Sequence, residues 1–467
     1  MYNFGLVGLG VMGQNFILNV ADSGFSVYGL DLDQEKVDKL IELGGDHHRI
    51  NATTDAKQFV ESLQAPRKIM LLVPAGKIVD KAIESLLPYL DKGDIIIDGG
   101  NSFYTDTDRR ESYLKEKEIN FFGSGVSGGA EGARKGPSIM PGGNREAYQH
   151  IKPIFEAAAA KFEGVPCVTY LGPKSAGNYV KMVHNGIEYG LMQLTSEIYD
   201  LLKKSCGLSN AELSELYAQW NDGRLKSFLV EITSEIFAQK DDLTDNDLVD
   251  MILDKAKQKG TGKWTSQNAM DLGIPVPSID IAVTMRELSA LKNTRIAADK
   301  LYDRPTPQPV DKARMMAQAE SALYFSFIVT YAQGLHQLAE ASEAYGYELN
   351  LSQVAKIWRA GCIIRAALLD DIAQAYDRSD DLVSLLMDEV FVSKVGETVS
   401  DARSLVAYAA TSGIPLPGLA NSLNYFDAFT SNRLPLNLIQ AQRDHFGSHT
   451  YERTDREGTF HTDWGHS

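Results

Sequence analysis

Cysteine, long apolar runs and excess positive charge are scarce or missing in this 467-residue sequence. The three cysteines, Cys167, Cys206 and Cys362, are widely spaced and form no CxxC pair, which argues against a disulfide framework or a metal site. No apolar run approaches the roughly 18 residues of a membrane-spanning helix. The 46 Lys and Arg residues against 62 Asp and Glu residues give a net charge of −16, so we expect neither a nucleic-acid partner nor a membrane partner held by bulk electrostatics.

The first residues also lack a targeting pattern. The first basic residue is Lys36, so neither the charged start of a secretory signal nor an Arg-rich transit peptide is expected. With cysteine usage that suits a reducing compartment, this predicts a cytoplasmic location. A small anionic ligand is still compatible with the negative net charge, because a few arginines in a cleft dominate the local potential.

The distribution of glycine divides the chain. Residues 1–175 hold 22 of the 39 glycines and alternate short apolar runs with amphipathic segments. The expected strands are at 4–8, 26–31, 68–73 and 95–98. Such alternation is typical of βαβ units and predicts an α/β domain of the Rossmann type with a parallel sheet.

The rest of the chain has a different texture. Residues 176–433 form long periodic segments rich in Leu, Ala, Glu and Gln, which predicts a large all-helical domain. Prolines at 305, 307 and 309 mark a loop inside it. Residues 434–467 form a polar C-terminal tail with little helical periodicity, and we expect it to be too short to build a core of its own.

The helical domain shows signs of an internal duplication. The segment GLMQL at 190–194 recurs as GLHQL at 334–338, and WxxG at 220–223 recurs at 358–361. The two matches lie 144 and 138 residues apart and keep the same order. The second copy therefore serves as an internal comparison for features of the first.

A dinucleotide fingerprint opens the chain. Gly8, Gly10 and Gly13 form GxGxxG after an apolar run and before a helical segment. The first glycine allows a tight turn, the second lets the backbone approach a pyrophosphate, and the third allows close packing of helix and strand. Three turn glycines without a ligand would share the spacing, but a second strand ending in Asp31 follows here and favours a dinucleotide site.

Other cofactor contacts are expected at the carboxyl ends of the strands. Asp31 can accept hydrogen bonds from the adenosine ribose, although solvated loop acids are a common alternative for Asp31 and Asp33. The loops VPAG at 73–76 and DGGNS at 98–102 should face the nicotinamide half. The expected cofactor site comprises Gly8, Leu9, Gly10, Val11, Met12, Gly13, Asp31, Leu32, Asp33, Val73, Pro74, Ala75 and Asn101.

A polar stripe lies where a buried helix face would be expected. Lys181, His184, Asn185 and Glu188 fall at i, i+3, i+4 and i+7 among apolar neighbours. A salt-bridged surface face would be the ordinary explanation. The second copy argues against it, because the corresponding positions carry only apolar side chains: Phe325, Ile328, Val329 and Ala332. We therefore interpret the stripe as catalytic.

The stripe suits acid–base chemistry. A neutral Lys181 can remove a hydroxyl proton while hydride leaves to the cofactor, and burial would lower the pKa of this lysine as required. Glu188 is then free for a second proton transfer, which a simple dehydrogenase does not need. Anion-holding candidates, each weak alone, are the glycine-rich segments 123–130 and 259–264, Arg286 between apolar residues, and Arg443 and His449 in the tail.

Over essentially its whole length the chain resembles the decarboxylating 6-phosphogluconate dehydrogenase family. The resemblance rests on GLGVMGQN from Gly8, DGGNS from Asp98, GSGVSGGAEGARKGPSIMPGG from Gly123, KMVHNGIEYG from Lys181, KGTGKWT from Lys259 and QRDHFGSHTYER from Gln442. It implies oxidation and decarboxylation of 6-phosphogluconate to ribulose 5-phosphate, a pentose phosphate pathway reaction, with Lys181 as general base and Glu188 as general acid. It also implies a homodimer whose tail reaches into the partner's active site. The implied substrate contacts are Asn101, Ser127, Gly128, Gly129, His184, Asn185, Tyr189, Lys259, Thr261, Arg286, Arg443 and His449.

The sequence departs from the family pattern after the second strand. Many members read Asn-Arg-Thr there and have a lysine before Ala-Gly, whereas this chain has Asp31-Leu32-Asp33 and Pro74. NADP needs a cation near its 2′-phosphate, so this segment predicts NAD as the favoured cofactor, with NADP as the alternative. A non-decarboxylating β-hydroxyacid dehydrogenase is the alternative activity, and Glu188 together with the phosphate-suited cations counts against it. A non-catalytic dinucleotide sensor is a third reading, which the intact stripe disfavours.

Overall fold

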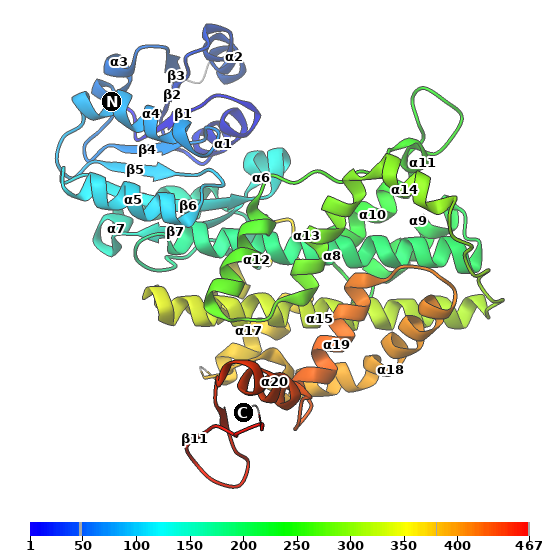
Figure 1. Ribbon diagram of the computed structural model, residues 1–467. Helices are drawn as coiled ribbons and strands as arrows, with labels where there is room; N and C mark the ends of the chain where they lie inside the picture. The colour runs from blue at the N-terminus through cyan, green and yellow to red at the C-terminus, as the bar shows by residue number, and fades with distance from the viewer. Residues whose placement is uncertain (46–48, 380, 466–467) are drawn as a thin grey trace.

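The computed structural model describes residues 1–45, 49–379 and 381–465, and these form an α/β region followed by a helical region and a projecting tail (Figure 1). The α/β region contains a seven-stranded sheet in the order β3-β2-β1-β4-β5-β6-β7, parallel except for β7. Its strands are β1 (Phe4–Val7), β2 (Val27–Leu30), β3 (Ile50–Thr53), β4 (Lys68–Leu71), β5 (Ile95–Asp98), β6 (Asn120–Ser127) and β7 (Ser138–Gly143).

Helices cover both faces of this sheet. They are α1 (Val11–Asp22), α2 (Gln34–Gly44), α3 (Ala56–Glu61), α4 (Lys77–Leu86), α5 (Tyr104–Lys115), α6 (Gly129–Lys135) and α7 (Arg145–Ala158), with the short η1 (Leu87–Tyr89). Ile95 and Ile97 pack on the α1 and α7 side, while Ile96 packs on the side of α3, α4 and α5. Because successive strand residues point to opposite faces, the continuous apolar runs of the sequence produce this doubly covered sheet. The predicted Rossmann-type domain is confirmed.

Two parts of the sequence interpretation of this region were incomplete. The structure adds β3, β6 and β7, none of which was predicted. The glycine-rich segment 123–130, which contains no predicted strand, is largely strand, because β6 runs to Ser127 and pairs with β7. Only Gly128 and Gly129 turn there, with φ values of 126° and 63° that suit glycine.

The helical region begins at Ala176. Its helices are α8 (Ala176–Cys206), α9 (Asn210–Asn221), α10 (Phe228–Ala238), α11 (Leu248–Met251), α12 (Thr261–Leu272), α13 (Pro277–Ala290), α14 (Lys292–Asp299), α15 (Lys312–Tyr345), α16 (Leu351–Ile357), α17 (Leu368–Arg378), η2 (Leu385–Met387), α18 (Glu389–Thr411) and α19 (Pro417–Phe429). A two-stranded pair, β8 (Lys161–Phe162) and β9 (Val165–Pro166), precedes it. The proline loop separates α14 from α15, as expected.

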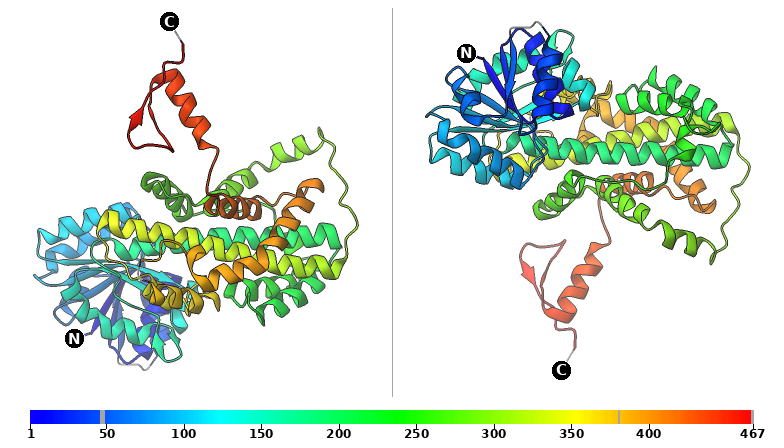
Figure 2. Two further views of the ribbon diagram at one scale, coloured as in Figure 1. Left: turned by 90° about the horizontal axis from the view of Figure 1, so that it is seen from below. Right: turned by 90° about the horizontal axis from the view of Figure 1, so that it is seen from above.

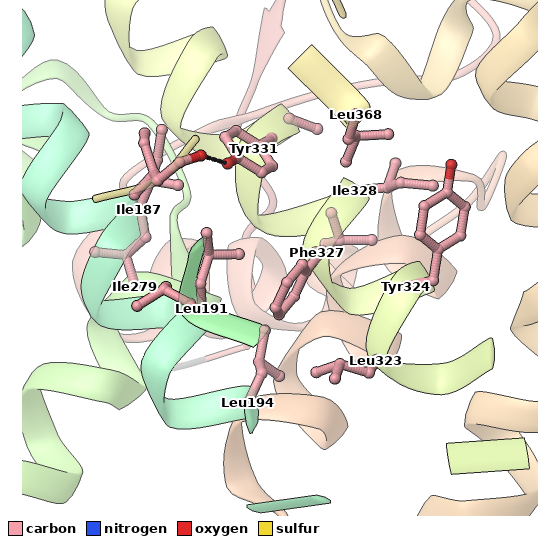
Figure 3. Packing of buried hydrophobic residues seen from close by; sticks show 14 of the residues in the cluster. Ile187, Leu191, Leu194, Ile279, Leu323, Tyr324, Phe327, Ile328, Tyr331 and Leu368 are labelled. Carbon is pink, nitrogen blue, oxygen red and sulfur yellow. Dashed lines mark hydrogen bonds between the residues drawn. The ribbon is translucent and has the colours of Figure 1, made fainter. Parts of the chain in front are cut away.

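The two long helices α8 and α15 form the centre of the helical region. Ile187, Leu191 and Leu194 of α8 pack with Phe327 and Ile328 of α15 in one apolar cluster (Figure 3). The comparison residues of the second copy are all fully buried: Phe325, Ile328, Val329 and Ala332. The polar stripe of α8 is therefore an exception within a helix pair built for apolar packing.

The element order supports the internal duplication. α13 and α19 each begin at the second proline of a GIPxP segment, at 273–277 and 413–417, and each first turn is bonded to a long helix of the other half. Ser278 N–H donates to Gln333 Oε1 on α15 (3.0 Å), while Gly418 and Leu419 N–H groups donate to the Glu197 carboxylate on α8 (2.7 and 3.0 Å). The sequence interpretation missed this third repeated segment.

The tail has more regular structure than predicted. It contains α20 (Leu436–Gly447) and a small hairpin of β10 (Tyr451–Glu452) and β11 (Thr459–Phe460), and it stands away from the helical region (Figure 2). The expectation of little helix there was wrong. Within the described residues, no helix combines the length and apolar character needed to cross a membrane.

Candidate active site

The fingerprint turn between β1 and α1 is shaped for a phosphate group. Gly8 has φ 96°, and a Cβ on it would lie 2.6 Å from the Leu72 carbonyl oxygen. A Cβ on Gly13 would lie 1.9 Å from the Gly8 carbonyl oxygen. A Cβ on Gly10 would meet nothing within 4 Å, and no side chain caps the first turn of α1. The open space and the free N–H groups at the start of this 12-residue helix fit a dinucleotide pyrophosphate.

The first turn of α1 and the end of β2 define the adenosine side. Val11 is exposed, Met12 is half-buried and Leu9 is buried. One Asp31 carboxylate oxygen accepts from Leu9 N–H (2.7 Å) and the other accepts from Asp33 N–H (3.0 Å). Asp31 is thus tied to the fingerprint turn and is not a freely solvated loop acid.

Asp33 has a structural role of its own. Its side chain caps α2 by accepting from Glu35 N–H (3.0 Å). Lys36 lies 3.5 Å from Asp31 and 3.6 Å from Asp33, so the nearest cation is already engaged by two carboxylates. Leu32 between them is 94% exposed and faces solvent where the ribose edge of a dinucleotide would lie.

The two loops expected at the nicotinamide half are joined by a buried arginine that sequence reasoning missed. Pro74, Ala75 and Asn101 are exposed, while Val73 is half-buried. Arg110 on α5 is only 1% exposed. It donates to the Gly76 carbonyl (3.0 Å) and to Asp80 (2.8 Å), and it lies 3.5 Å from Asp98.

Asn178 connects the Asn101 loop with the helix of the polar stripe. It lies one turn before Lys181 on α8, and its Nδ2 donates to the Gly100 carbonyl (3.3 Å) while its Oδ1 accepts from Thr107 (2.8 Å). Extending the stripe back by three residues would have found it. The contact sets the loop that carries Asn101 against the helix that carries Lys181.

His184 is the centre of the polar stripe. Its Nδ1 lies 3.4 Å from Lys181 Nζ, 3.1 Å from Asn185 Oδ1 and 3.9 Å from Glu188 Oε2. Its Nε2 lies 3.2 Å from Ser127 Oγ at the end of β6. The structure thus brings together four predicted stripe residues and one residue of the predicted glycine segment. Ile363 N–H also reaches Ser127 Oγ, at 3.4 Å.

Burial shifts the pKa values of the stripe residues in opposite directions. Burial lowers the pKa of Lys181, and the nearby Glu188 opposes this. Burial raises the pKa of Glu188, with Lys181 and Arg286 opposing. Burial and then the Lys181 charge lower the pKa of His184 well below its usual value, so the imidazole is neutral. A lysine that loses its proton readily and a carboxyl that keeps one are suited to act as base and acid.

Arg286 and Tyr189 form a wall of the site next to Glu188. The guanidinium lies 3.5 Å from the Tyr189 ring centroid, and burial lowers its pKa. It forms no ion pair with any carboxylate in the described ranges of the chain, which is expensive for a buried cation without an anionic ligand. A Cβ on Gly262 would lie 2.3 Å from the Tyr189 ring, so the start of α12 also borders this wall.

The glycine-rich segment 259–264 is partly helix, because α12 begins at Thr261. Lys259 is exposed and precedes the helix, while the buried Thr261 begins α12. Arg443 and His449 are not brought to the site within one chain. Both are exposed on the projecting tail, and the views from either side show the tail clear of α8 (Figure 2).

A Rossmann-type sheet with a pyrophosphate turn, followed by a helix bearing a buried lysine and a carboxyl whose pKa is raised by burial, defines a nicotinamide-dependent dehydrogenase with a helical second domain. The profile described as NAD binding domain of 6-phosphogluconate dehydrogenase matches residues 3–172, and that of the 6-phosphogluconate dehydrogenase C-terminal domain matches residues 177–464. The chain therefore belongs to the 6-phosphogluconate dehydrogenase family.

Individual relatives agree along the whole chain. The Bacillus subtilis (strain 168) protein named 6-phosphogluconate dehydrogenase, NADP(+)-dependent, decarboxylating is 51% identical over 462 residues, covering 98% of each chain. The decarboxylating 6-phosphogluconate dehydrogenase of Escherichia coli (strain K12) is 50% identical with the same coverage. The Plasmodium falciparum 6-phosphogluconate dehydrogenase, solved in its apo form and with NADP+ or 6-phosphogluconate, superposes with a TM-score of 0.96 at 45% identity, covering 99% of this chain and 100% of that one.

Proposed function

We propose that this protein oxidises and decarboxylates 6-phosphogluconate to ribulose 5-phosphate and CO2, with Lys181 as base and Glu188 as acid. The observation that carries the proposal is the pair itself: the buried Lys181 and the half-buried Glu188 lie on one face of α8, and burial shifts their pKa values in opposite directions. Decarboxylating activity in the names of the relatives supports it.

In the first step, neutral Lys181 takes the proton of the substrate's C3 hydroxyl. A nicotinamide dinucleotide held by the turn at Gly8–Gly13 and the Asn101 loop would supply the hydride acceptor, and the same carbon becomes a ketone as the hydride leaves. Asn178 and Arg110 position the cofactor loops relative to Lys181. Asn178 bonds the Asn101 loop to α8, and Arg110 connects that loop to the loop after β4. Such positioning is a large part of catalysis when two groups react.

The second step uses the new ketone. The carboxylate β to it leaves as CO2, the bonding electron pair moves to the ketone oxygen, and protonated Lys181 returns its proton there to give an enediol. Glu188 then protonates the carbon that lost CO2 while Lys181 takes back the proton of the C3 hydroxyl, which becomes the ketone of ribulose 5-phosphate. The turnover therefore ends with Lys181 protonated and Glu188 ionised. His184 Nδ1 lies between the two groups, at 3.4 and 3.9 Å, and provides a route for the proton to return.

The substrate is held by groups that suit a sugar acid phosphate. Ser127 contacts His184 from the end of β6, Gly128 and Gly129 follow it, and Asn101 and Asn185 supply amide groups. The family resemblance adds Tyr189, Lys259, Thr261 and Arg286, and Tyr189 packs against both Arg286 and the start of α12. The unpaired guanidinium of Arg286 supports a phosphate there, since Arg binds phosphate with geometry as well as charge. We further propose a homodimer in which the partner's tail adds Arg443 and His449.

A non-decarboxylating β-hydroxyacid dehydrogenase would need only the base. Glu188 would then be a carboxyl buried beside a cation for no chemical reason, at a cost in desolvation. The test is to supply 6-phosphogluconate and oxidised cofactor and to measure both products. We expect one CO2 and one ribulose 5-phosphate for each reduced nicotinamide. Reduced nicotinamide without CO2 would contradict the proposal.

Cofactor choice is a separate proposal. A dinucleotide whose ribose hydroxyls meet Asp31 would be NAD, because the 2′-phosphate of NADP would face that carboxylate. At about 4 Å and an effective dielectric near 20, such a like-charge pair costs about 4 kcal/mol before relaxation. The Bacillus subtilis relative named as NADP(+)-dependent and the Plasmodium falciparum complex with NADP+ point to NADP instead. We propose NAD as the preferred cofactor, and the proposal rests only on the carboxylates at the end of β2. Lys36 is already paired with Asp31 and Asp33 and is therefore not free to bind a 2′-phosphate.

The cofactor proposal is tested by kcat/KM for NAD and for NADP at saturating 6-phosphogluconate. A clear preference for NADP would overturn it and leave the activity itself untouched. If NAD is preferred, Leu32→Arg combined with Asp31→Asn should move the preference towards NADP. Leu32 is almost fully exposed, so an arginine there has room to reach a 2′-phosphate without repacking the core.

A further inference from the structure

The carboxylate of Asp444 in the tail is surrounded by four hydrogen-bond donors. Asp444 lies in the last turns of α20, directly after Arg443, and its side chain is 0% exposed. The tail stands clear of the rest of the chain (Figure 2), so the groups that cover Asp444 come from the tail itself. A buried carboxylate in so small a unit requires a compensating set of bonds.

Four donors from two later segments meet this carboxylate. Its Oδ1 accepts from Thr450 N–H (2.9 Å) and lies 2.8 Å from His461 Nδ1. Its Oδ2 accepts from Thr462 N–H (3.1 Å) and from the Trp464 indole N–H (2.9 Å). Desolvation alone would raise the pKa of Asp444, but the bonds led by His461 hold it well below its ordinary value. The group is therefore a carboxylate, and His461 Nδ1 is the donor.

The same bonds fix the two residues that the tail offers to the substrate. Arg443 precedes Asp444 on α20, and His449 precedes Thr450, which bonds to Asp444. A second link runs parallel: Arg443 donates to Gln440 Oε1 (3.1 Å), and Gln440 Nε2 donates to the Thr450 carbonyl (2.6 Å). The helix end and the turn after it thus form one closed unit.

We propose that Asp444 is a positioning residue for substrate binding, which folds the tail in advance so that Arg443 and His449 reach the substrate phosphate as a set. The inference rests on the proposed function, in which the tail completes the partner's site. Ordering these side chains before binding removes a cost that would otherwise weaken affinity for the substrate. Asp444 itself does not touch the substrate.

Asp444→Asn is the test, because it keeps the shape and replaces one acceptor oxygen by a donor. We expect the KM for 6-phosphogluconate to rise about tenfold or more, with kcat changed far less and the KM for the dinucleotide unchanged. Asp455→Asn is the matched control in the same tail, since Asp455 pairs with Arg453 and Arg456 on the surface. A KM for 6-phosphogluconate within twofold of wild type would overturn the proposal.

A second variant covers the case in which Asp444→Asn does not fold. Trp464→Phe keeps an aromatic ring and removes one of the four donors, so it should raise the same KM by a smaller factor; an unchanged KM would again overturn the proposal. Arg443→Ala distinguishes the positioning role of Asp444 from the role of the tail in substrate binding. If Arg443→Ala raises the KM and Asp444→Asn does not, only the positioning role fails. If Arg443→Ala leaves the KM unchanged, the tail's place in the proposed function fails, and Asp444 fails with it.

Discussion

At the residue scale, the acid–base character of the site depends on the burial of Lys181 and Glu188. Burial disfavours charge, so it lowers the pKa of Lys181 and raises the pKa of Glu188. A neutral amine and a protonated carboxyl can then coexist on one helix face. The neutral His184 lies against both, and its Nε2 meets Ser127, which keeps the ring oriented.

These shifts predict a bell-shaped dependence of kcat on pH. Activity should fall on the acid side as Lys181 becomes protonated, since the base must be neutral, and on the alkaline side as Glu188 ionises, since the acid must carry a proton. Glu188→Gln should remove the alkaline limb from its residual activity. An alkaline limb that persists unchanged in this variant would show that another group is responsible. His184 should add no limb, because its pKa lies well below its usual range.

Sequence reasoning reached the groups that share one helix or one motif. The stripe on α8, the fingerprint glycines and Asp31 could be predicted because their spacing carries the information. Arg110 could not, since its partners at Gly76 and Asp98 are set by how strands and helices pack. Asn178 extends the stripe by one turn and could have been found, but its partner at Gly100 could not. Sequence periodicity predicts which face of a helix a residue lies on. It does not predict which residues of other helices or strands will contact that face.

At the scale of elements, α8 does more than carry the site. Glu197, further along the same helix, is 4% exposed and accepts two N–H groups from the first turn of α19, the helix that leads into the tail. Burial raises the pKa of Glu197 to about 7, with Gln193 and the α19 backbone opposing. The helix α8 and the base of the tail are therefore joined through a group whose pKa lies near neutrality.

Glu197 should make stability depend on pH. Its folded pKa of about 7 lies above the ordinary 4.5, so the folded state binds the proton more tightly and its contribution is complete below pH 4.5. That contribution, about 3 kcal/mol, is lost as pH rises towards 7. Thermal unfolding of Glu197→Gln and wild type should show the variant gaining midpoint temperature relative to wild type between pH 5 and pH 8. An equal difference at both pH values would contradict this role.

Several elements were hidden from sequence patterns for a physical reason. β6 and β7 are rich in glycine, because neighbouring backbone and side chains lie too close for a Cβ: one on Gly125 would be 2.3 Å from Lys181 Cβ. Such strands resemble loops in composition. The helix α20 was missed because it packs against its own hairpin and leaves most apolar residues exposed, so it shows little amphipathic periodicity.

At the scale of the whole molecule, one chain does not assemble every residue that the family resemblance assigns to the substrate. The tail, which carries Arg443 and His449, projects from the body (Figure 2). The tail could reach the active site of its own chain only by folding back onto the body. In the proposed homodimer it instead extends into the active site of the partner subunit. The cofactor turn and the stripe on α8 lie in the body and need no tail to form.

Truncation after Leu434 should therefore leave nicotinamide dinucleotide binding intact and abolish binding of 6-phosphogluconate, as calorimetry with each ligand would show. Mixing Arg443→Ala subunits with Lys181→Met subunits should restore part of the activity, because one site of each mixed dimer has both an intact body and an intact partner tail. Mixed dimers that form without regaining activity would indicate that each tail serves its own subunit.

The central claim is that Lys181 and Glu188 divide the proton transfers, and deuterium exchange tests the division most directly. By reversibility, an acid that protonates the carbon left by CO2 also removes a proton from C1 of ribulose 5-phosphate. Wild-type enzyme with reduced cofactor in D2O should incorporate deuterium at C1, measured by NMR. Glu188→Gln should lose this exchange, and Lys181→Met should give neither reduced nicotinamide nor CO2 in the forward direction. Exchange at the wild-type rate in Glu188→Gln, or near-normal turnover by Lys181→Met, would contradict the assignment.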